Sequence, residues 1–249
     1  DKVAIISMTN RTEWNICDIG ILQTGAQDVP IYPTIAEEDY AYILNHSQSV
    51  YCFVSCEFVL EKINNIKDQV PSLKDVYSFD TIAGCNHWEK LLELGKDKSY
   101  QDEVEMRKNN INELDLATII YTSGTTGRSK GAMLTQQNIL SNAVALVEAW
   151  KFTADDILLH ALPIFHTHGL FVATNVTLVA GGSMVFMPKF DLDVMVERMP
   201  EATTLMGVPT FYTRLLEDKR FNLASTAHMR LFVSGSAPLL AETHVKFEE

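Results

Sequence analysis

The stretch with the clearest chemical content covers residues 121–131 and has the sequence YTSGTTGRSKG. It combines hydroxyl side chains, glycines and the cations Arg128 and Lys130, and it directly follows the apolar run of residues 116–120. Glycine lets the backbone turn so that successive N–H groups point at one oxyanion, hydroxyls add donors, and lysine supplies a mobile positive charge. The pattern therefore predicts a phosphate-binding loop after a buried strand.

Two alternatives can be compared with this interpretation. A Walker A loop requires glycines at both ends of a four-residue gap, then Lys, then Ser or Thr. Counting from Gly124, the second glycine position holds Ser129, and Gly131 follows Lys130, so the motif is not a Walker A loop. A polar loop without function would also be rich in Ser, Thr and Gly. Eleven ordered positions behind a strand make coincidence a poor explanation.

The same stretch resembles, nearly letter for letter, the phosphate-binding signature of the adenylate-forming (AMP-binding) superfamily of acyl-CoA synthetases, luciferases and peptide-synthetase adenylation domains. Most members carry Pro where this chain has Ser129, and the spelling GRSKGAM of residues 127–133 is similar to malonyl-CoA synthetases. The resemblance implies that Lys130 and Thr126 are catalytic and that Thr126 is a candidate Mg²⁺ ligand. The nucleotide-binding residues that it implies in this loop are Thr122, Ser123, Gly124, Thr125, Thr126, Gly127 and Lys130.

A second segment, residues 161–170, reads ALPIFHTHGL and places two histidines one residue apart. Such a pair could ligate a metal, but no third ligand cluster is nearby in the sequence. The resemblance implies that Phe165 and His166 form walls of the substrate pocket and that His166 is also catalytic. The alternative is that His166 and His168 only cap a helix over residues 169–179.

Two later segments extend the resemblance. Residues 206–214, MGVPTFYTR, are similar to malonyl-CoA synthetases, and the forked guanidinium of Arg214 is suited to holding a second substrate carboxylate. The alternative is an exposed helical arginine beside Glu217 and Asp218. Residues 234–239, SGSAPL, resemble the superfamily's turn against adenine and the acyl group. This implies substrate contacts from Ser234 and Gly235 and nucleotide contacts from Ser236, Ala237 and Pro238.

Composition narrows the class of protein. The chain has 249 residues, of which 47% are hydrophobic, and a net charge of −12. Residues 1–120 contain 10 basic and 20 acidic residues, whereas residues 121–249 contain 10 and 12. Such an acidic surface argues against a nucleic-acid partner.

No apolar run approaches the ~20 residues of a membrane helix, and no leader is visible, so neither a transmembrane segment nor a signal peptide is expected. Four cysteines without a zinc pattern favour a reduced, cytoplasmic compartment.

Apolar strand-like segments alternate with segments of helical spacing, which predicts an α/β fold of mostly parallel sheets flanked by helices. Asn10, Thr34 and Thr135 are the expected helix N-caps. Pro30 and Pro33 are expected to keep the extended residues 28–34 out of a central ladder, either at a strand edge or in an ordered connection. Expected strands cover residues 2–7, 50–54, 76–79, 116–120, 132–134, 183–188, 203–208 and 231–234; expected helices cover residues 11–21, 35–45, 58–70, 88–94, 136–150, 169–179, 191–199 and 211–217.

A charged run over residues 96–112 predicts a boundary between two α/β subdomains. Residues 1–112 would be a scaffold, and residues 113–249 would carry the phosphate loop and the acyl pocket. The resemblance implies two adjoining βα layers within the large N-terminal domain of an adenylating enzyme. Residues 20–34 and 42–47 resemble long-chain fatty acyl-CoA synthetases, and His46, near an expected helix end, is interpreted as a capping or surface residue.

Together these resemblances imply an ATP-dependent acyl-CoA synthetase that forms an acyl-adenylate and pyrophosphate and then a thioester with coenzyme A, with Mg²⁺ on the polyphosphate. Malonate or a similar small dicarboxylate is the first predicted substrate, and a medium- or long-chain fatty acid is the alternative. The two halves resemble different subgroups, which leaves a mixed family or a junction near residue 131 open. The superfamily's Tyr-Gly-x-Thr-Glu segment, ribose-binding Asp and C-terminal lid with its catalytic Lys are not in the sequence. A nucleotide-binding fragment with little turnover of its own is therefore a further alternative.

Overall fold

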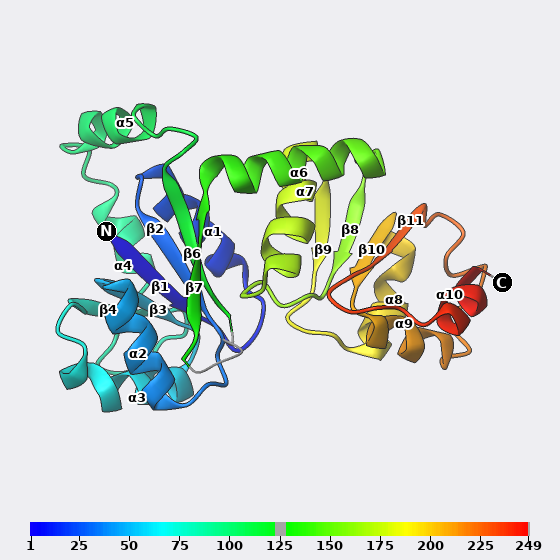
Figure 1. The fold of residues 1–249 in the computed structure, drawn as a ribbon, viewed down its shortest axis with the longest axis horizontal. Helices are drawn as coiled ribbons and strands as arrows, with labels where there is room; N and C mark the ends of the chain where they lie inside the picture. The colour runs from blue at the N-terminus through cyan, green and yellow to red at the C-terminus, as the bar shows by residue number, and fades with distance from the viewer. Residues whose placement is uncertain (123–127, 249) are drawn as a thin grey trace. The chain divides into compact units, whose positions relative to one another are not determined.

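The structure is a computed structural model that describes residues 1–122 and 128–248 (Figure 1). Its contacts divide the chain into two compact units, Asp1–Ile139 and Leu140–Glu249. This division differs from the predicted boundary after residue 112 because strands β6 (Leu116–Thr122) and β7 (Lys130–Thr135) belong to the sheet of the first unit.

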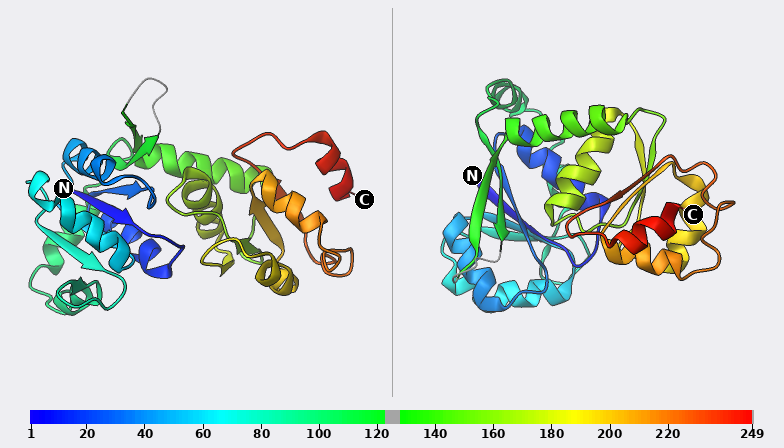
Figure 2. Two further views of the ribbon diagram at one scale, coloured as in Figure 1. Left: turned by 90° about the horizontal axis from the view of Figure 1, so that it is seen from below. Right: turned by 45° about the vertical axis from the view of Figure 1, so that its right-hand side comes forward.

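The first unit is built on a seven-stranded sheet with the order β5-β4-β3-β1-β2-β6-β7. Strands β1 to β6 pair in parallel along this order, and β7 pairs antiparallel with β6, as Figure 2 shows. The first five strands are β1 (Lys2–Ile6), β2 (Gln27–Ile31), β3 (Tyr51–Val54), β4 (Asp75–Ser78) and β5 (Asn86–His87). The helices are α1 (Thr12–Gln23), α2 (Glu37–Ser47), α3 (Glu57–Ile66), η1 (Lys67–Gln69), α4 (Glu89–Leu94) and α5 (Gln101–Asn109).

Helices α2 and α3 share one hydrophobic core with the inward side chains of the sheet. Ile6, Leu44 and Ile63 are fully buried members of this core. Burying one such side chain stabilises the fold by about 1.5–3 kcal/mol. The core therefore fixes α2 firmly against the sheet, which matters for the site described below.

Strand β2 lies inside the sheet, so the expectation that excluded a central ladder role is wrong for residues 28–31, whereas residues 32–34 form a connection after the strand. Gln27 donates its N–H to the Asp1 carbonyl and therefore faces β1. Because alternate residues of a strand face alternate neighbours, Pro30 faces β6. Among the described residues, the β2–β6 register consists of the pair Asp28–Thr118. Pro30 therefore lies beyond the paired part of β2 and β6, where no N–H is needed for a hydrogen bond to β6.

Two of the three expected N-caps are also wrong. Arg11 and Ala36 occupy the N-cap positions of α1 and α2 and make no side-chain capping hydrogen bond, so Asn10 and Thr34 do not cap these helices. The expectation for Thr135 is confirmed, because its Oγ1 accepts from the Asn138 N–H at 3.2 Å and Asn138 Oδ1 accepts from the Thr135 N–H at 3.0 Å. The charged run contains α5, which is exposed along its whole length and carries the ion pair Arg107–Glu103.

A buried acidic pair lies between α1 and the sheet of the first unit. Asp18 of α1 is 6% exposed, while Asp28 of β2 and its register partner Thr118 are fully buried. Loss of solvent raises the pKa of both carboxyls, and the neighbouring charge of Asp28 raises the pKa of Asp18 further. The pair therefore retains at least one proton in a range where exposed carboxyls are ionised.

The second unit contains a four-stranded parallel sheet in the order β11-β10-β8-β9. Its strands are β8 (Ile157–His160), β9 (Ser183–Phe186), β10 (Thr204–Gly207) and β11 (Leu231–Ser234). The helices are α6 (Gln136–Trp150), which contains the point of division, a π-helix η2 (His168–Thr174), α7 (Asn175–Ala180), α8 (Leu192–Arg198), η3 (Met199–Glu201), α9 (Pro209–Leu216) and α10 (Ala241–Glu248). Strand β10 is buried along its length, whereas β9 and β11 are mostly half-buried. Strand β8 was not among the expected strands.

Asp156 and Arg230 join the amino ends of β8 and β11. Arg230 donates from Nε to Asp156 Oδ1 and from Nη2 to Asp156 Oδ2, both at 2.6 Å. Asp156 also accepts from the Thr153 N–H at 2.8 Å and from Thr203 Oγ1 at 2.9 Å. The Asp156 side chain is 3% exposed, so this pair organises the sheet from one end.

No helix in the described part of the chain has the length and apolarity needed to cross a membrane.

Candidate functional site

The flanks of the predicted phosphate loop lie at the tip of the β6–β7 pair. Thr122 and Lys130 are register partners there, and both are exposed. Because β6 runs parallel to β2 and β1, the loop leaves the sheet at the edge where parallel strands end, which is where open α/β sheets bind ligands. Ser123, Gly124, Thr125, Thr126 and Gly127 lie outside the described residues, so their roles stay predictions.

The close packing of the β6–β7 pair explains one glycine of the motif. A Cβ on Gly131 would lie 2.7 Å from Ile119 Cγ2 and 3.3 Å from the Tyr121 ring. Real Cβ atoms essentially never approach another atom as closely as the 2.7 Å to Ile119. Glycine at position 131 therefore permits the Ile119 and Tyr121 side chains to pack against the β7 backbone beside the loop.

Helix α2 contacts both flanks of the loop, which the sequence analysis did not anticipate. His46 Nδ1 lies 2.7 Å from Tyr121 Oη, and Tyr42 Oη donates to the Ser129 carbonyl at 3.2 Å. His46 is thus a hydrogen-bonding neighbour of the loop. Contacts that span 75 and 87 residues leave no local signal in the sequence.

Residues 163–168 form the turn that leads from β8 into the π-helix η2. Phe165 is half-buried and His166 is exposed, with their ring centroids 4.6 Å apart. The His166 carbonyl accepts from the Leu170 N–H at 2.9 Å. The expected α-helix over residues 169–179 is instead a π-helix followed by α7, and π-helical turns occur frequently at functional sites.

His168 joins the π-helix to the turn after β11. Its Nδ1 lies 2.9 Å from Ser236 Oγ, and burial lowers the pKa of its imidazole. A Cβ on Gly235 would lie 2.8 Å from His168 Cε1, so glycine permits this approach. Ser236 itself has a φ of 68°, in the left-handed region. The structure thus brings together His168, Ser234, Gly235 and Ser236, while Ala237 and Pro238 follow as exposed residues.

Arg214 lies in a neighbouring aromatic cluster. Its guanidinium carbon sits 4.7 Å from the centroid of the Phe190 ring, which in turn is 4.1 Å from the Phe211 ring. Arg214 is exposed and forms no ion pair with an acidic side chain among the described residues; Asp218 pairs with Arg220. The exposed position on α9 agrees with the alternative of an exposed helical arginine beside Glu217 and Asp218, although no ion pair with either carboxylate forms among the described residues.

The turn after β11 and the aromatic cluster around Arg214 both contact Gly207, at the end of β10. The Gly235 N–H donates to the Gly207 carbonyl at 3.1 Å, and a Cβ on Gly207 would lie 2.9 Å from Phe211 Cδ2. The turn after β11 and the Arg214 cluster therefore meet at the carboxyl end of the parallel sheet. This is the candidate acyl site of the second unit.

His160 is a third histidine of this region that the sequence analysis did not single out. It ends β8, is 1% exposed, and its Nε2 lies 3.0 Å from the Gly169 carbonyl and 3.1 Å from Thr174 Oγ1. Burial lowers the pKa of His160 to about 4. The imidazole is therefore neutral at physiological pH and supports the first turn of η2.

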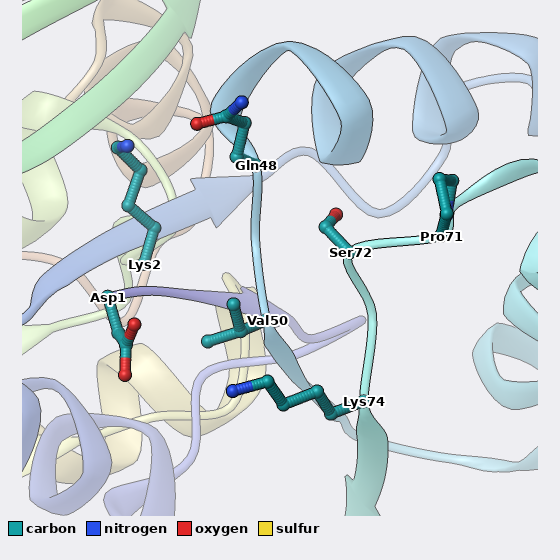
Figure 3. A pocket seen from close by; sticks show the side chains of 7 residues that line it. All are labelled: Asp1, Lys2, Gln48, Val50, Pro71, Ser72 and Lys74. Carbon is teal, nitrogen blue, oxygen red and sulfur yellow. The ribbon is translucent and has the colours of Figure 1, made fainter.

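A surface hollow in the first unit lies away from these residues. It is lined by Asp1, Lys2, Gln48, Val50, Pro71, Ser72 and Lys74 (Figure 3). Lys2, Val50 and Lys74 stand at or just before the amino ends of β1, β3 and β4. The hollow thus lies at the amino ends of the parallel strands, whereas the phosphate loop follows the carboxyl end of β6.

Within the described residues, no group of three or more His, Cys, Asp and Glu side chains is placed to hold a metal ion. The cysteines Cys17, Cys52, Cys56 and Cys85 are all free. Thr126, the predicted Mg²⁺ ligand, belongs to the segment outside the description.

The parallel sheets, with glycines and polar side chains gathered at their carboxyl ends, define an α/β protein whose candidate residues lie where this class of fold binds ligands. The family model for AMP-binding enzymes matches residues 1–249, and the chain belongs to this family.

Known relatives of the chain fall into two groups. The malonate–CoA ligase of Arabidopsis thaliana is 31% identical over 248 residues, which cover 89% of this chain and 38% of the relative. The long-chain-fatty-acid–CoA ligase of Mycobacterium bovis is 30% identical over 257 residues, which cover 100% and 40%. The solved structure of ATP-bound MatB from Rhodopseudomonas palustris has a TM-score of 0.82 and 38% identity, over 100% of this chain and 47% of that one. The chain thus spans less than half the length of these relatives.

Proposed function

We propose that this chain provides the phosphate loop and acyl site of an ATP-dependent acyl-CoA ligase. The observation that carries the proposal is the motif YTSGTTGRSKG, whose flanks Thr122 and Lys130 stand exposed at the carboxyl end of β6 in a chain of the AMP-binding family. The names of its relatives, which are ligases of carboxylates to coenzyme A, support the same reaction.

The proposed reaction has two steps. A carboxylate oxygen attacks the α-phosphorus of ATP, the bond to the pyrophosphate oxygen breaks, and an acyl-adenylate forms. The coenzyme A thiol, after loss of its proton, then attacks the acyl carbon, and AMP leaves. The first step concentrates negative charge around phosphorus, which Lys130, the Thr122 hydroxyl and the loop N–H groups would stabilise.

Mg²⁺ would enter this reaction with ATP, as the counter-ion of the polyphosphate. The predicted protein ligand of Mg²⁺, Thr126, lies outside the described residues, so its role stays a prediction. The cytoplasmic compartment also stays a prediction from the cysteine pattern; one relative, the human malonate–CoA ligase, is named as mitochondrial.

For the substrate we propose malonate or a similar small dicarboxylate. Arg214 presents a charged guanidinium, exposed and without an acidic partner among the described residues, from the aromatic cluster beside Gly207. A guanidinium in this state suits the second carboxylate of malonate, which a fatty acid lacks. The relatives named as malonate–CoA ligases support this choice. A long-chain fatty acid is the second candidate, favoured by the M. bovis relative, which matches the entire chain.

The role of Lys130 can be tested by pyrophosphate release. In the complete protein, Lys130→Ala should slow release by about two orders of magnitude, since one well-placed donor contributes ~3 kcal/mol to the barrier. Lys219→Ala, which removes another exposed lysine, is the control and should behave like the wild type. Unchanged release by Lys130→Ala would remove Lys130 from the reaction.

The choice of substrate can be tested by comparing malonate with palmitate in wild type and Arg214→Ala. A hydrogen-bonded charge pair contributes about 1.5–3 kcal/mol, so kcat/KM for malonate should fall by about ten-fold to one hundred-fold and that for palmitate should not. Arg198→Ala, which removes an exposed Arg–Glu pair, is the matched control. An equal loss on both substrates would exclude Arg214 from binding the second carboxylate.

A nucleotide-binding module without turnover is the alternative of another class. Residues 1–249 alone can be incubated with ATP and malonate while pyrophosphate is measured. ATP-dependent thermal stabilisation without pyrophosphate release would assign binding, and not catalysis, to this part of the chain.

A further inference from the structure

We propose that Tyr42 and His46, on helix α2, are positioning residues that hold both flanks of the phosphate loop for nucleotide binding. This inference rests on the proposed function of that loop. Tyr42 contacts Ser129, which immediately precedes Lys130, and His46 contacts Tyr121, which immediately precedes Thr122. Each of the two exposed loop-flanking residues is therefore adjacent to a residue anchored by α2.

Helix α2 is a firm support for these anchors. Its other side buries Tyr40, Ile43 and Leu44 in the core of the first unit, at exposures of 0%, 3% and 0%. Tyr42 and His46 are four residues apart and therefore share the face directed at the loop. Their rings stack with centroids 5.4 Å apart. Each ring thus restricts the other, and both are held by a helix that cannot shift without disturbing the core.

The contact of His46 with Tyr121 is geometrically well defined. The His46 and Tyr121 rings meet edge to face with centroids 5.8 Å apart, in addition to the 2.7 Å hydrogen bond. Burial raises the pKa of Tyr121 to about 12, so its hydroxyl remains protonated at neutral pH. The phenol therefore keeps a proton for this hydrogen bond throughout the physiological range.

Tyr42 contacts Arg128, one of the two cations of the motif, and leaves the other, Lys130, exposed. The guanidinium carbon of Arg128 lies 5.0 Å from the centroid of the Tyr42 ring, within the range of a cation–π contact. Lys130 is exposed and forms no ion pair among the described residues. Tyr42 thus holds Arg128 beside helix α2, while the Lys130 ammonium remains free to move toward a phosphate.

Three variants of the complete protein test this proposal. Tyr42→Phe removes the hydrogen bond to Ser129 but keeps the ring under Arg128. His46→Ala removes the imidazole, and Tyr121→Phe removes its hydroxyl partner. Glu38→Ala is the control, because Glu38 is an exposed residue of the same helix and makes no hydrogen bond or ion pair with the described residues of the loop.

The expected effect is specific to the nucleotide. One hydrogen bond of net strength near 1 kcal/mol corresponds to about five-fold in an equilibrium constant. We expect KM for ATP to rise about five-fold in Tyr42→Phe and five- to ten-fold in His46→Ala, with KM for the carboxylate and the melting temperature unchanged. The double variant His46→Ala/Tyr121→Phe should have the same KM for ATP as His46→Ala, since both changes remove the same hydrogen bond between His46 and Tyr121.

Amide hydrogen exchange over residues 121–131 gives a readout that does not depend on activity. It should be several-fold faster in Tyr42→Phe and His46→Ala than in the wild type or Glu38→Ala. Exchange equal to the wild type would overturn the positioning role, and so would faster exchange with an unchanged KM for ATP. If the wild type released no pyrophosphate with any carboxylate but the variants still exchanged faster and bound ATP more weakly by calorimetry, the proposed reaction would fail while the positioning role stood.

Discussion

Removing Arg230 should destabilise the second unit more than any other single surface-accessible charge described above. The Arg230 side chain is 37% exposed, but its partner Asp156 is only 3% exposed. Breaking a buried pair by removing one partner costs about 3–5 kcal/mol, because the other charge stays buried and unpaired. Asp156 keeps hydrogen bonds from Thr153 and Thr203, so we expect the lower end, about 3 kcal/mol, for Arg230→Ala.

The pH dependence of this loss follows from the pKa of Asp156. Burial alone would raise this pKa, but hydrogen bonds from Arg230, Thr153 and Thr203 outweigh it and lower the pKa to about 2. A carboxyl whose pKa is lower in the folded state stabilises the fold above the unfolded value near 3.8, and this contribution is lost as pH falls toward 2. The shift corresponds to about 2 kcal/mol at pH 7, of which about half is lost by pH 3. Arg230→Ala should therefore be most damaging at neutral pH.

Urea unfolding at pH 7 and pH 3, followed by fluorescence and circular dichroism, measures both effects. Arg198→Ala is the control, since Arg198 and Glu201 form an exposed pair, 46% and 51% accessible, whose loss should cost less than about 1 kcal/mol. The reasoning would be refuted if Arg230→Ala lost no more free energy of unfolding than Arg198→Ala at pH 7. It would also be refuted if the loss were as large at pH 3 as at pH 7.

Two further predictions concern the cores. Asp28→Asn should gain stability relative to the wild type as pH rises from 4 to 8, because burial raises the pKa of Asp28 to about 7 from an unfolded value near 3.8, and the stability of the protonated form is lost between these two values. Thermal melts at pH 4 and pH 8 measure this, and an equal effect of the substitution at both pH values would contradict it. Gly235→Ala should lower the melting temperature by several degrees, because its Cβ would lie 2.8 Å from His168 Cε1. Gly20→Ala, a helical position with open space around it, should be neutral or slightly stabilising.

Local pattern was enough to predict the class of the fold. The alternation of strands and helices predicted the parallel α/β architecture, and residues 231–234 were predicted as the strand that the structure contains. Pro30 was misplaced because a proline excludes only one ladder hydrogen bond, and the side of the strand on which it falls depends on the register with distant strands. The caps of α1 and α2 failed for a similar reason: without a side-chain cap, these helices begin where tertiary packing sets them.

The candidate site was predictable only where its chemistry is local. Residues 121–131 carry their glycines, hydroxyls and lysine in one continuous stretch, so composition alone indicates a phosphate loop. The contact of His168 with Ser236 joins residues 68 positions apart, and no spacing in the sequence encodes it. The same holds for the anchors Tyr42 and His46. Sequence patterns thus indicate which residues could bind a ligand, whereas the fold determines which residues hold them in place.

The degree of burial separates the roles that His160, His166 and His168 of the second unit can fill. His160 is 1% exposed, and its Nε2 lies within hydrogen-bond distance of the Gly169 carbonyl and Thr174 Oγ1, so it supports η2 from inside the fold. His168 is buried against Ser236, and its lowered pKa favours a neutral imidazole. His166 is the exposed member. The proposed first step needs no general base, because a carboxylate is already ionised when it attacks phosphorus. A role for His166 would therefore be to donate a hydrogen bond or shape the pocket, and His166→Gln should retain more pyrophosphate release than His166→Ala, with a flat pH profile between pH 6 and 8 in both.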